Sequence, residues 1–304
     1  MTTRPTDAEA MPRTGAGAHL FGAVGLHADL IKSRQTLLLL ATGVTGYLTA
    51  QPQRGSLGEG ALMLVSLFAA ISGTTALNMV LDRDIDARME RTANRSLPSG
   101  VVSPGGAARF GGAFVLLGLV IAFWMDVLFG AVIVVGVLFD LLVYTIWLKR
   151  RSPWAILIGG ISGGMPILAG RTLAAGRVDV LGLLLAFSVL TWIPVHIVTL
   201  AIKYAADYEE AGIPTLPTVN GDQGARVFKA YANVLRTVAL VSAGWYLRIP
   251  AYGLGLLTLS GTFMLGLSLW SMWRPSPRLN HLLFKFASLD MLVSMILLTL
   301  GPVL

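Results

Sequence analysis

The feature that most constrains this chain is the recurrence of apolar segments long enough to cross a lipid bilayer. About 20 apolar residues span the hydrocarbon core, and such segments follow one another with short polar breaks. Only 13% of the residues are charged and 55% are hydrophobic, whereas about 25% are charged in soluble domains. The predicted fold is an all-α membrane protein, a bundle of nine transmembrane helices at residues 34–50, 59–81, 106–125, 128–148, 154–173, 181–202, 226–247, 250–273 and 282–303.

The first 28 residues precede these segments and are rich in Thr, Pro, Gly and Ala. They contain no apolar run of the kind that marks a cleavable signal peptide. We therefore expect a flexible N-terminal tail at 1–28, followed by one transmembrane domain at 29–304.

Lysine and arginine gather in alternate loops between the apolar segments. Because loops that stay in the cytoplasm carry the excess of positive charge, we expect a cytoplasmic N-terminus and a C-terminus on the opposite side. The loops around residues 78–100, 149–151 and 203–217 then lie on the cytoplasmic side. This topology explains the net charge of +7 without a nucleic-acid-binding domain. The chain has no cysteine, which excludes disulfides and thiolate metal sites.

The stretch 78–100 concentrates acidic and basic residues at the end of the second apolar segment. If the segment ends as a helix, Asn78, Asp82 and Asp86 follow at intervals of four residues and share one face. Carboxylates at membrane depth are costly and usually mark substrate or ion sites. Mg²⁺ prefers oxygen ligands and is commonly shared between one or two carboxylates and substrate phosphates. The face therefore predicts a Mg²⁺ site, although a loop whose acids merely pair with neighbouring arginines would have the same spacing.

Two further polar segments fall on the same side of the predicted membrane. The loop 203–217 carries Asp207 near a helix end, because Gly212 and Pro214 stop the helix. Basic residues follow the fourth apolar segment, where Lys149 and Arg150 come soon after Tyr144. Cations beside two acidic clusters suit a diphosphate, whose leaving charge both metal and cations can stabilise. The positive-inside rule alone would also place basic residues there.

Three polar residues lie inside apolar segments. Asp140 and Asp290 are intramembrane acids and are functional candidates for that reason. His196 could act as an acid, a base or a ligand to an acceptor. Either acid can also be a buried structural group, and for Asp290 we favour that interpretation. A lone His in an apolar helix is more often a packing residue.

The motifs taken together resemble the UbiA superfamily of intramembrane prenyltransferases, and most closely its branch of protoheme IX farnesyltransferases, also called heme O synthases. The resemblance covers roughly residues 30 to 220. It is carried, in order, by Asn78-x₃-Asp82-Arg-Asp-Ile-Asp86-x₂-Met89-x-Arg91-Thr92-x₂-Arg95-x-Leu97-Pro-Ser-Gly100, Tyr144-Thr-x-Trp-Leu-Lys149-Arg150, Gly163-Gly-Met-Pro166, Pro194-x-His196 and Asp207-Tyr-x₂-Ala-Gly212-Ile-Pro-x-Leu-Pro217.

The resemblance implies an enzyme that ionises an allylic diphosphate, farnesyl diphosphate being the expected donor, with Mg²⁺ as cofactor. The prenyl group is then transferred to a membrane-associated acceptor, heme being favoured. Implied metal ligands are Asn78, Asp82, Asp86 and Asp207, and implied catalytic residues add Tyr144 and Lys149. The implied substrate-binding residues are Lys32, Arg34, Arg91, Arg95, Arg150, His196 and Glu210.

The chain departs from the heme-type pattern mainly around the expected acceptor. A Gly-Trp of that branch is Gly170-Arg171 here, and its His-Phe-Trp is His196-Ile197-Val198. The acceptor therefore stays open between heme and a quinone precursor, a chlorin or a lipid headgroup. A cation- or proton-coupled secondary transporter is an alternative of another class, but transporters need a polar route through both faces, and the strong polar clusters here lie on one.

Overall fold

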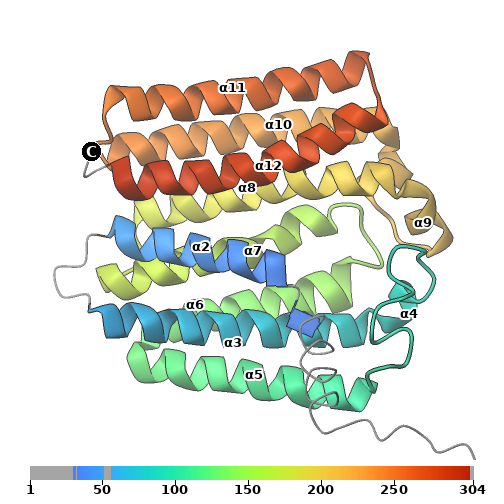
Figure 1. Ribbon diagram of the computed structural model, residues 1–304, viewed down its shortest axis with the longest axis horizontal. Coiled ribbons are helices and arrows are strands. Elements are labelled where there is room, and N and C mark those ends of the chain that lie inside the picture. The colour runs from blue at the N-terminus through green and yellow to red at the C-terminus, as the bar shows by residue number, and fades with distance from the viewer. Residues whose placement is uncertain (1–29, 32, 51–55, 302–304) are drawn as a thin grey trace, which may run out of the picture.

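The computed structural model describes residues 30–31, 33–50 and 56–301, which form a bundle of long helices lying side by side (Figure 1). The described residues contain no strand. Within this described part of the chain, seven helical segments are long and apolar enough to cross a membrane. They are α3 (Leu57–Leu81), α5 (Pro104–Met125), α6 (Val127–Leu138) continued by the π-helix η1 (Phe139–Leu148), α7 (Ala155–Ala175), α8 (Val180–Lys203), α11 (Ala251–Trp273) and α12 (Pro277–Leu300). The all-α fold is confirmed.

Two more long helices fall on the remaining predicted spans. The helix α2 (Ser33–Thr49) has 17 residues. The helix α10 (Leu216–Tyr246) is interrupted at Gly221, where φ is 71°, and carries buried basic residues that make it less apolar. The count of nine transmembrane helices therefore stays a prediction. The expected tail at 1–28 lies outside the described residues.

Helix α8 lies at the centre of the packing and contacts α7, α10 and α12. On the other side of α7, α2 approaches so closely that side chains would not fit at the crossing. A Cβ on Gly46 would lie 1.9 Å from the carbonyl oxygen of Ile167, and a Cβ on Gly170 would lie 2.1 Å from that of Gly43. The glycines therefore permit the α2–α7 contact, which forms one wall of the cavity described below.

The two acidic segments of the sequence meet at one end of the bundle. The short helices α4 (Arg83–Asp86) and α9 (Ala205–Glu210) both lie at the right-hand end of Figure 1. Ile85 and Met89 pack against Ala211 and Ile213, which follow α9. Apolar contacts thus bring the two loops together although they are far apart in sequence.

The end of α3 differs from the continuous helical face that the spacing suggested. The helix stops at Leu81, and Asp82 is its C-cap residue, whose backbone N–H donates to the carbonyl of Asn78 at 2.9 Å. The short helix α4 then begins at Arg83. The chain bends at Asp82, so the three predicted ligands come from two helices and the residue between them.

Candidate active site

A cavity of about 890 Å³ opens among α2, α3, η1, α7, α8 and α12. This volume is within the range of roughly 300–1,000 Å³ that is common for small-molecule sites. Most of the lining is aliphatic, and apart from Asp140 the charged side chains come from the end of the bundle where α4 and α9 meet. The polar residues that line it include Asn78, Asp82, Asp86, Arg91, Arg95, Asp140, Tyr144, Lys149 and His196.

The acids of the first motif are buried and paired with cations. Lys149 donates from Nζ to Oδ2 of Asp82, and Arg95 donates from Nη1 to Oδ2 of Asp86 at 3.0 Å. The other oxygen of Asp82, Oδ1, is buried and has no hydrogen-bond partner among the described residues. A buried acceptor without a donor is unusual in proteins, and here it lies beside a cavity.

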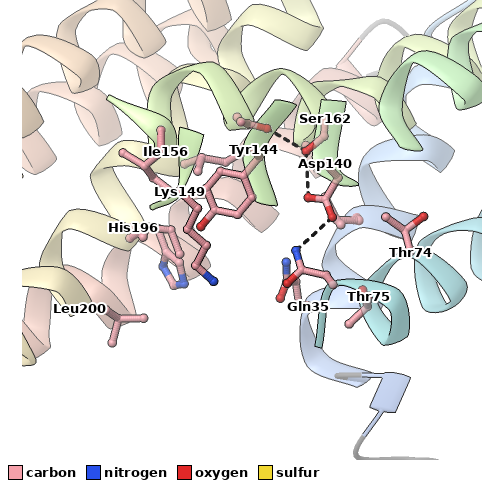
Figure 2. A pocket seen from close by; sticks show the side chains of 18 of the residues that line it. Gln35, Thr74, Thr75, Asp140, Tyr144, Lys149, Ile156, Ser162, His196 and Leu200 are labelled. Atoms are coloured by element: carbon pink, nitrogen blue, oxygen red, sulfur yellow. Dashed lines mark hydrogen bonds between the residues drawn. The ribbon is translucent and has the colours of Figure 1, made fainter. Parts of the chain in front are cut away.

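The π-helix η1 brings Tyr144 and Lys149 to the same face. In an α-helix of 3.6 residues per turn, residues five apart point in directions roughly 140° different. In η1 the backbone N–H of Lys149 donates to the carbonyl of Tyr144 at 2.8 Å, so residues five apart are stacked. The Lys149 ammonium lies 5.7 Å from the centroid of the Tyr144 ring. Both side chains reach the cavity for this reason (Figure 2).

Lys149 lies just beyond the membrane-spanning part of η1 and stays protonated in this setting. Burial alone would lower its pKa, but Tyr144 and the ion pair with Asp82 raise the pKa above the usual lysine value. A permanently charged ammonium at the charged end of the cavity suits an anionic substrate.

Arg91 and Arg95 are two predicted substrate-binding residues that line the cavity. Arg95 pairs with Asp86, and the Arg91 guanidinium lies 5.3 Å from the centroid of the Tyr204 ring. With Lys149, they give the cavity three cations at the end where the acids lie.

Other predicted site residues lie outside the cavity wall. Arg150 makes a bidentate ion pair with the exposed Asp84, and its hydrogen bonds lower the pKa of Asp84 to about 2. Asp207 and Glu210, in α9, are not among the described residues that line the cavity, whereas their neighbour Tyr208 is.

Two predicted substrate-binding residues lie at or just before the start of α2. Lys32 lies outside the described residues, and so does the side chain of Arg34. Gln35, the next residue of α2, lines the cavity. The start of α2 therefore reaches the site.

His196 projects into the cavity from α8, within a stack of rings. Its imidazole lies 4.9 Å from the Trp192 ring and 4.3 Å from the Phe284 ring, both near parallel to it. The hydroxyl of Ser288 lies 3.3 Å from Nδ1. Arg171, where the sequence also departs from the heme-type pattern, pairs with Asp179 instead and does not line the cavity in the described structure.

The two intramembrane acids have different surroundings. Asp140 lines the cavity and contacts Asn78 and Ser162. Asp290 is bound by Arg236 and Ser260 away from the cavity. The structural interpretation of Asp290 fits these contacts. Thr145 and Ser162 were missed in the sequence, because a lone hydroxyl in an apolar helix gives no signal.

Among the described residues, no group of three or more His, Cys, Asp or Glu side chains is arranged to hold a metal ion. The candidate ligands here are fewer and of mixed type: the Asp82 and Asp86 carboxylates, with the amide of Asn78 beside them. Such a set leaves coordination positions for substrate oxygens, which is how Mg²⁺ is commonly bound with phosphates.

The sequence matches the model of the UbiA prenyltransferase family over residues 39–289. The chain belongs to the UbiA prenyltransferase family. As a member it is a prenyltransferase and an integral, multi-pass membrane protein, and the assignment favours this activity over the transporter alternative.

Curated relatives of this prenyltransferase are 38–41% identical to it over about three quarters of the chain. The protoheme IX farnesyltransferase of Archaeoglobus fulgidus is 41% identical over 224 residues, which cover 73% of this chain and 77% of that protein. Those of Rhizorhabdus wittichii and Thermofilum pendens are 40% and 38% identical, over 78% and 77% of this chain and 78% and 79% of theirs.

Solved structures show the same fold at lower sequence identity. A structure of digeranylgeranylglyceryl phosphate synthase has a TM-score of 0.75 and 19% identity, covering 93% of this prenyltransferase and 99% of that chain. A UbiA homolog from Archaeoglobus fulgidus bound to GPP and Mg²⁺ has a TM-score of 0.64 and 15% identity, covering 90% and 99%.

Proposed function

We propose that this chain transfers the farnesyl group of farnesyl diphosphate to protoheme IX and requires Mg²⁺. The observation that carries the proposal is a cavity with paired acids and cations at one end and an aliphatic wall beyond them. A prenyl diphosphate has the same two parts. The relatives named protoheme IX farnesyltransferase support this donor and acceptor.

The residues present fit a Mg²⁺ ion. Asp82 and Asp86 would hold it, with Asn78 as a third oxygen donor, because the buried Oδ1 of Asp82 has no donor of its own within the described structure. We also propose Asp207, in the second acidic motif, as a metal ligand, because its loop contacts the loop of the first motif. When bound, Mg²⁺ neutralises diphosphate charge and so stabilises the leaving group.

The cations of the site have a role both before and after the diphosphate binds. Without substrate, Lys149 and Arg95 neutralise Asp82 and Asp86. When a diphosphate binds, both cations donate to its oxygens and stabilise the charge that develops as the C1–O bond breaks. Arg91, on the same part of the lining, adds a third donor. We propose that the Tyr144 hydroxyl contacts the same diphosphate.

Beyond the charged end, the wall excludes water and accommodates the prenyl chain. Leu39, Ile71 and Ile133 are among the aliphatic side chains that line this part. Exclusion of water protects a reactive allylic cation from hydrolysis. C1 of the cation then forms a carbon–carbon bond with the terminal carbon of the acceptor's vinyl group, which leaves the positive charge on the adjacent carbon. Water adds to that carbon and loses one proton to solvent, which gives the hydroxyethylfarnesyl product.

The rings around His196 support a flat aromatic acceptor. The rings of Trp192 and Phe284 each stack with the imidazole, and all three residues line the cavity. Aromatic faces of this kind bind planar groups by offset stacking. We assign His196 to the acceptor end of the site.

The proposed topology has nine transmembrane helices, α2 and α10 included. The N-terminus and the loops that contain α4 and α9 are cytoplasmic, and the C-terminus lies on the opposite side. The basic residues of the sequence support this orientation, which makes the charged end of the cavity accessible to a water-soluble diphosphate.

The test is incubation of the purified protein with farnesyl diphosphate, Mg²⁺ and protoheme, followed by mass spectrometry. We expect a farnesylated heme and an equal amount of released diphosphate. Parallel reactions with a quinone precursor, a chlorin and a glycerol phosphate lipid test the other acceptors. Product with one of these and none with protoheme would overturn the heme assignment.

A further inference from the structure

The side-chain amide of Asn78 is held by two acceptors on η1. Its Nδ2 donates to Oδ2 of Asp140 at 3.2 Å and to Oγ1 of Thr145 at 3.0 Å. Thr145 gives its own hydroxyl proton to the main-chain carbonyl of Asp140 at 2.7 Å. Oγ1 of Thr145 is therefore left with lone pairs only, and it can accept from Asn78 but not donate to it.

This arrangement determines which way the Asn78 amide faces. A primary amide has two N–H donors and one oxygen in a plane. Since both donors point to η1, the oxygen Oδ1 points away from η1. Asn78 lies one helical turn before Asp82, whose buried Oδ1 has no partner in the described part of the chain. Asn78 and Asp82 both line the cavity.

Asp140 is itself held in place by the wall of the cavity. The hydroxyl of Ser162, on α7, lies 3.3 Å from its Oδ1, and the same hydroxyl donates to the carbonyl of Gly159 at 2.7 Å. Figure 2 shows Asp140 below Ser162 and pointing into the cavity. It precedes Tyr144 on η1 by four residues, so it lies deeper than the cations of the charged end.

We propose that Asp140 is a positioning residue for the proposed Mg²⁺ site, because it fixes the orientation of the Asn78 amide. This inference rests on the proposed function. Oδ2 of Asp140 and Oγ1 of Thr145 both accept from Nδ2, and this pair of acceptors defines one orientation of the Asn78 amide. Asp140→Asn supplies a donor of similar shape, which lets Asn78 turn its oxygen toward η1 and withdraw it from the metal.

The test measures metal binding without turnover. Mn²⁺ replaces Mg²⁺, an unreactive thiolodiphosphate analogue of farnesyl diphosphate replaces the substrate, and free Mn²⁺ is followed by electron paramagnetic resonance. Loss of a group that orients a metal ligand typically weakens affinity by roughly 10- to 100-fold. We expect a weakening in this range for Asp140→Asn, with an unfolding temperature close to that of the unmodified protein.

Thr145 provides a matched pair of variants. Thr145→Val removes the second acceptor of the Asn78 amide and is expected to weaken Mn²⁺ binding. Thr145→Ser keeps the hydroxyl and is expected to retain it. Because both variants change the packing of the same position, a loss in both would indicate a structural role and would contradict the proposal.

A double-mutant cycle separates positioning from the charge of Asp140. In an Asn78→Ala background, Asp140→Asn should weaken Mn²⁺ binding by less than about twofold, because residues that act through one another are not additive. Additive losses, or unchanged affinity in Asp140→Asn alone, would overturn the inference. Farnesyl transfer by the unmodified protein is assayed in the same preparation, so a failure of the proposed function is seen separately.

Discussion

Asp82 and Asp290 are both buried acids paired with a cation, yet their second oxygens differ. Oδ2 of Asp82 binds Lys149, and Oδ1 has no partner among the described residues. In Asp290, Oδ2 binds Arg236 and Oδ1 accepts from Ser260. Asp82 lines the cavity, whereas Asp290 joins α10, α11 and α12 outside it.

The difference separates a site from a structural contact. Both acids are costly to bury, but at Asp290 each carboxylate oxygen has a donor. An acid left with a free acceptor beside a cavity is suited to a ligand that supplies the missing contact. The comparison predicts that substitutions at Asp290 reduce stability, whereas substitutions at Asp82 reduce activity.

The largest effect is expected at the structural pair. Asp290→Asn leaves the buried guanidinium of Arg236 without a counter-charge, which typically costs about 3–5 kcal/mol. Thermal unfolding in detergent should show a clear decrease in unfolding temperature. The double variant Arg236→Met with Asp290→Leu should recover much of the loss, since no charge is then buried alone. An Asp290→Asn protein as stable as the original would contradict the structural assignment.

At Asp82 the effect should appear in catalysis. We expect Asp82→Asn to lower diphosphate release by about 100-fold or more, because a metal ligand and the partner of Lys149 are lost together. The loss of stability should be smaller than at Asp290, since the Lys149 side chain is 17% exposed and that of Arg236 only 1%. Undiminished release from farnesyl diphosphate would remove Asp82 from the metal site.

Lys149 gives a smaller effect and a pH test. Lys149→Met should lower diphosphate release roughly 10- to 100-fold, because one donor to the leaving group is lost. Its pKa is raised, so the ammonium stays charged at neutral pH. Its contribution to stability is fully present below the unfolded lysine pKa of about 10.4 and is lost only as pH rises through the higher folded value. Between pH 7 and about pH 9.5, diphosphate release by the unmodified protein and by Lys149→Met should therefore change with pH in the same way.

The smallest effect is expected at Asp84, which has a cation partner but lies outside the cavity. Its side chain is 50% exposed in the pair with Arg150, and exposed pairs contribute less than about 1 kcal/mol. Its pKa is lowered to about 2, so the contribution is present above the unfolded pKa of about 3.9 and is lost as pH falls toward 2. Asp84→Asn should match the original in activity and in unfolding temperature at pH 7. A large loss of activity would show that the site extends to this pair.

Much of the fold could be predicted because long apolar segments constrain a membrane chain strongly. The seven helices that meet the criteria for spanning agree with predicted segments within a few residues. The first and seventh segments are harder to assign, because α2 is short and α10 carries buried polar residues, such as Lys229 and Arg236, that lower its hydropathy.

The site could be predicted only where spacing follows the α-helical period. Asn78, Asp82 and Asp86 were recognised in this way, although the helix ends between them. The approach of Tyr144 to Lys149 depends on a π-helix, which a five-residue spacing does not reveal by itself. The sequence also does not show which cation pairs with which acid. Arg150 binds Asp84, while the adjacent Lys149 binds Asp82.

The central claim is that the acids and cations at one end of the cavity ionise an allylic diphosphate. Diphosphate release by the purified protein, with farnesyl diphosphate and protoheme present, tests it most directly when Mg²⁺ is removed by a chelator and then restored. We expect release to stop without Mg²⁺ and to resume when the ion returns. Removal of the ion should change the unfolding temperature little, since Lys149 and Arg95 still neutralise the acids. Release that continues without any divalent ion, or no release by folded protein with Mg²⁺ present, would contradict the account.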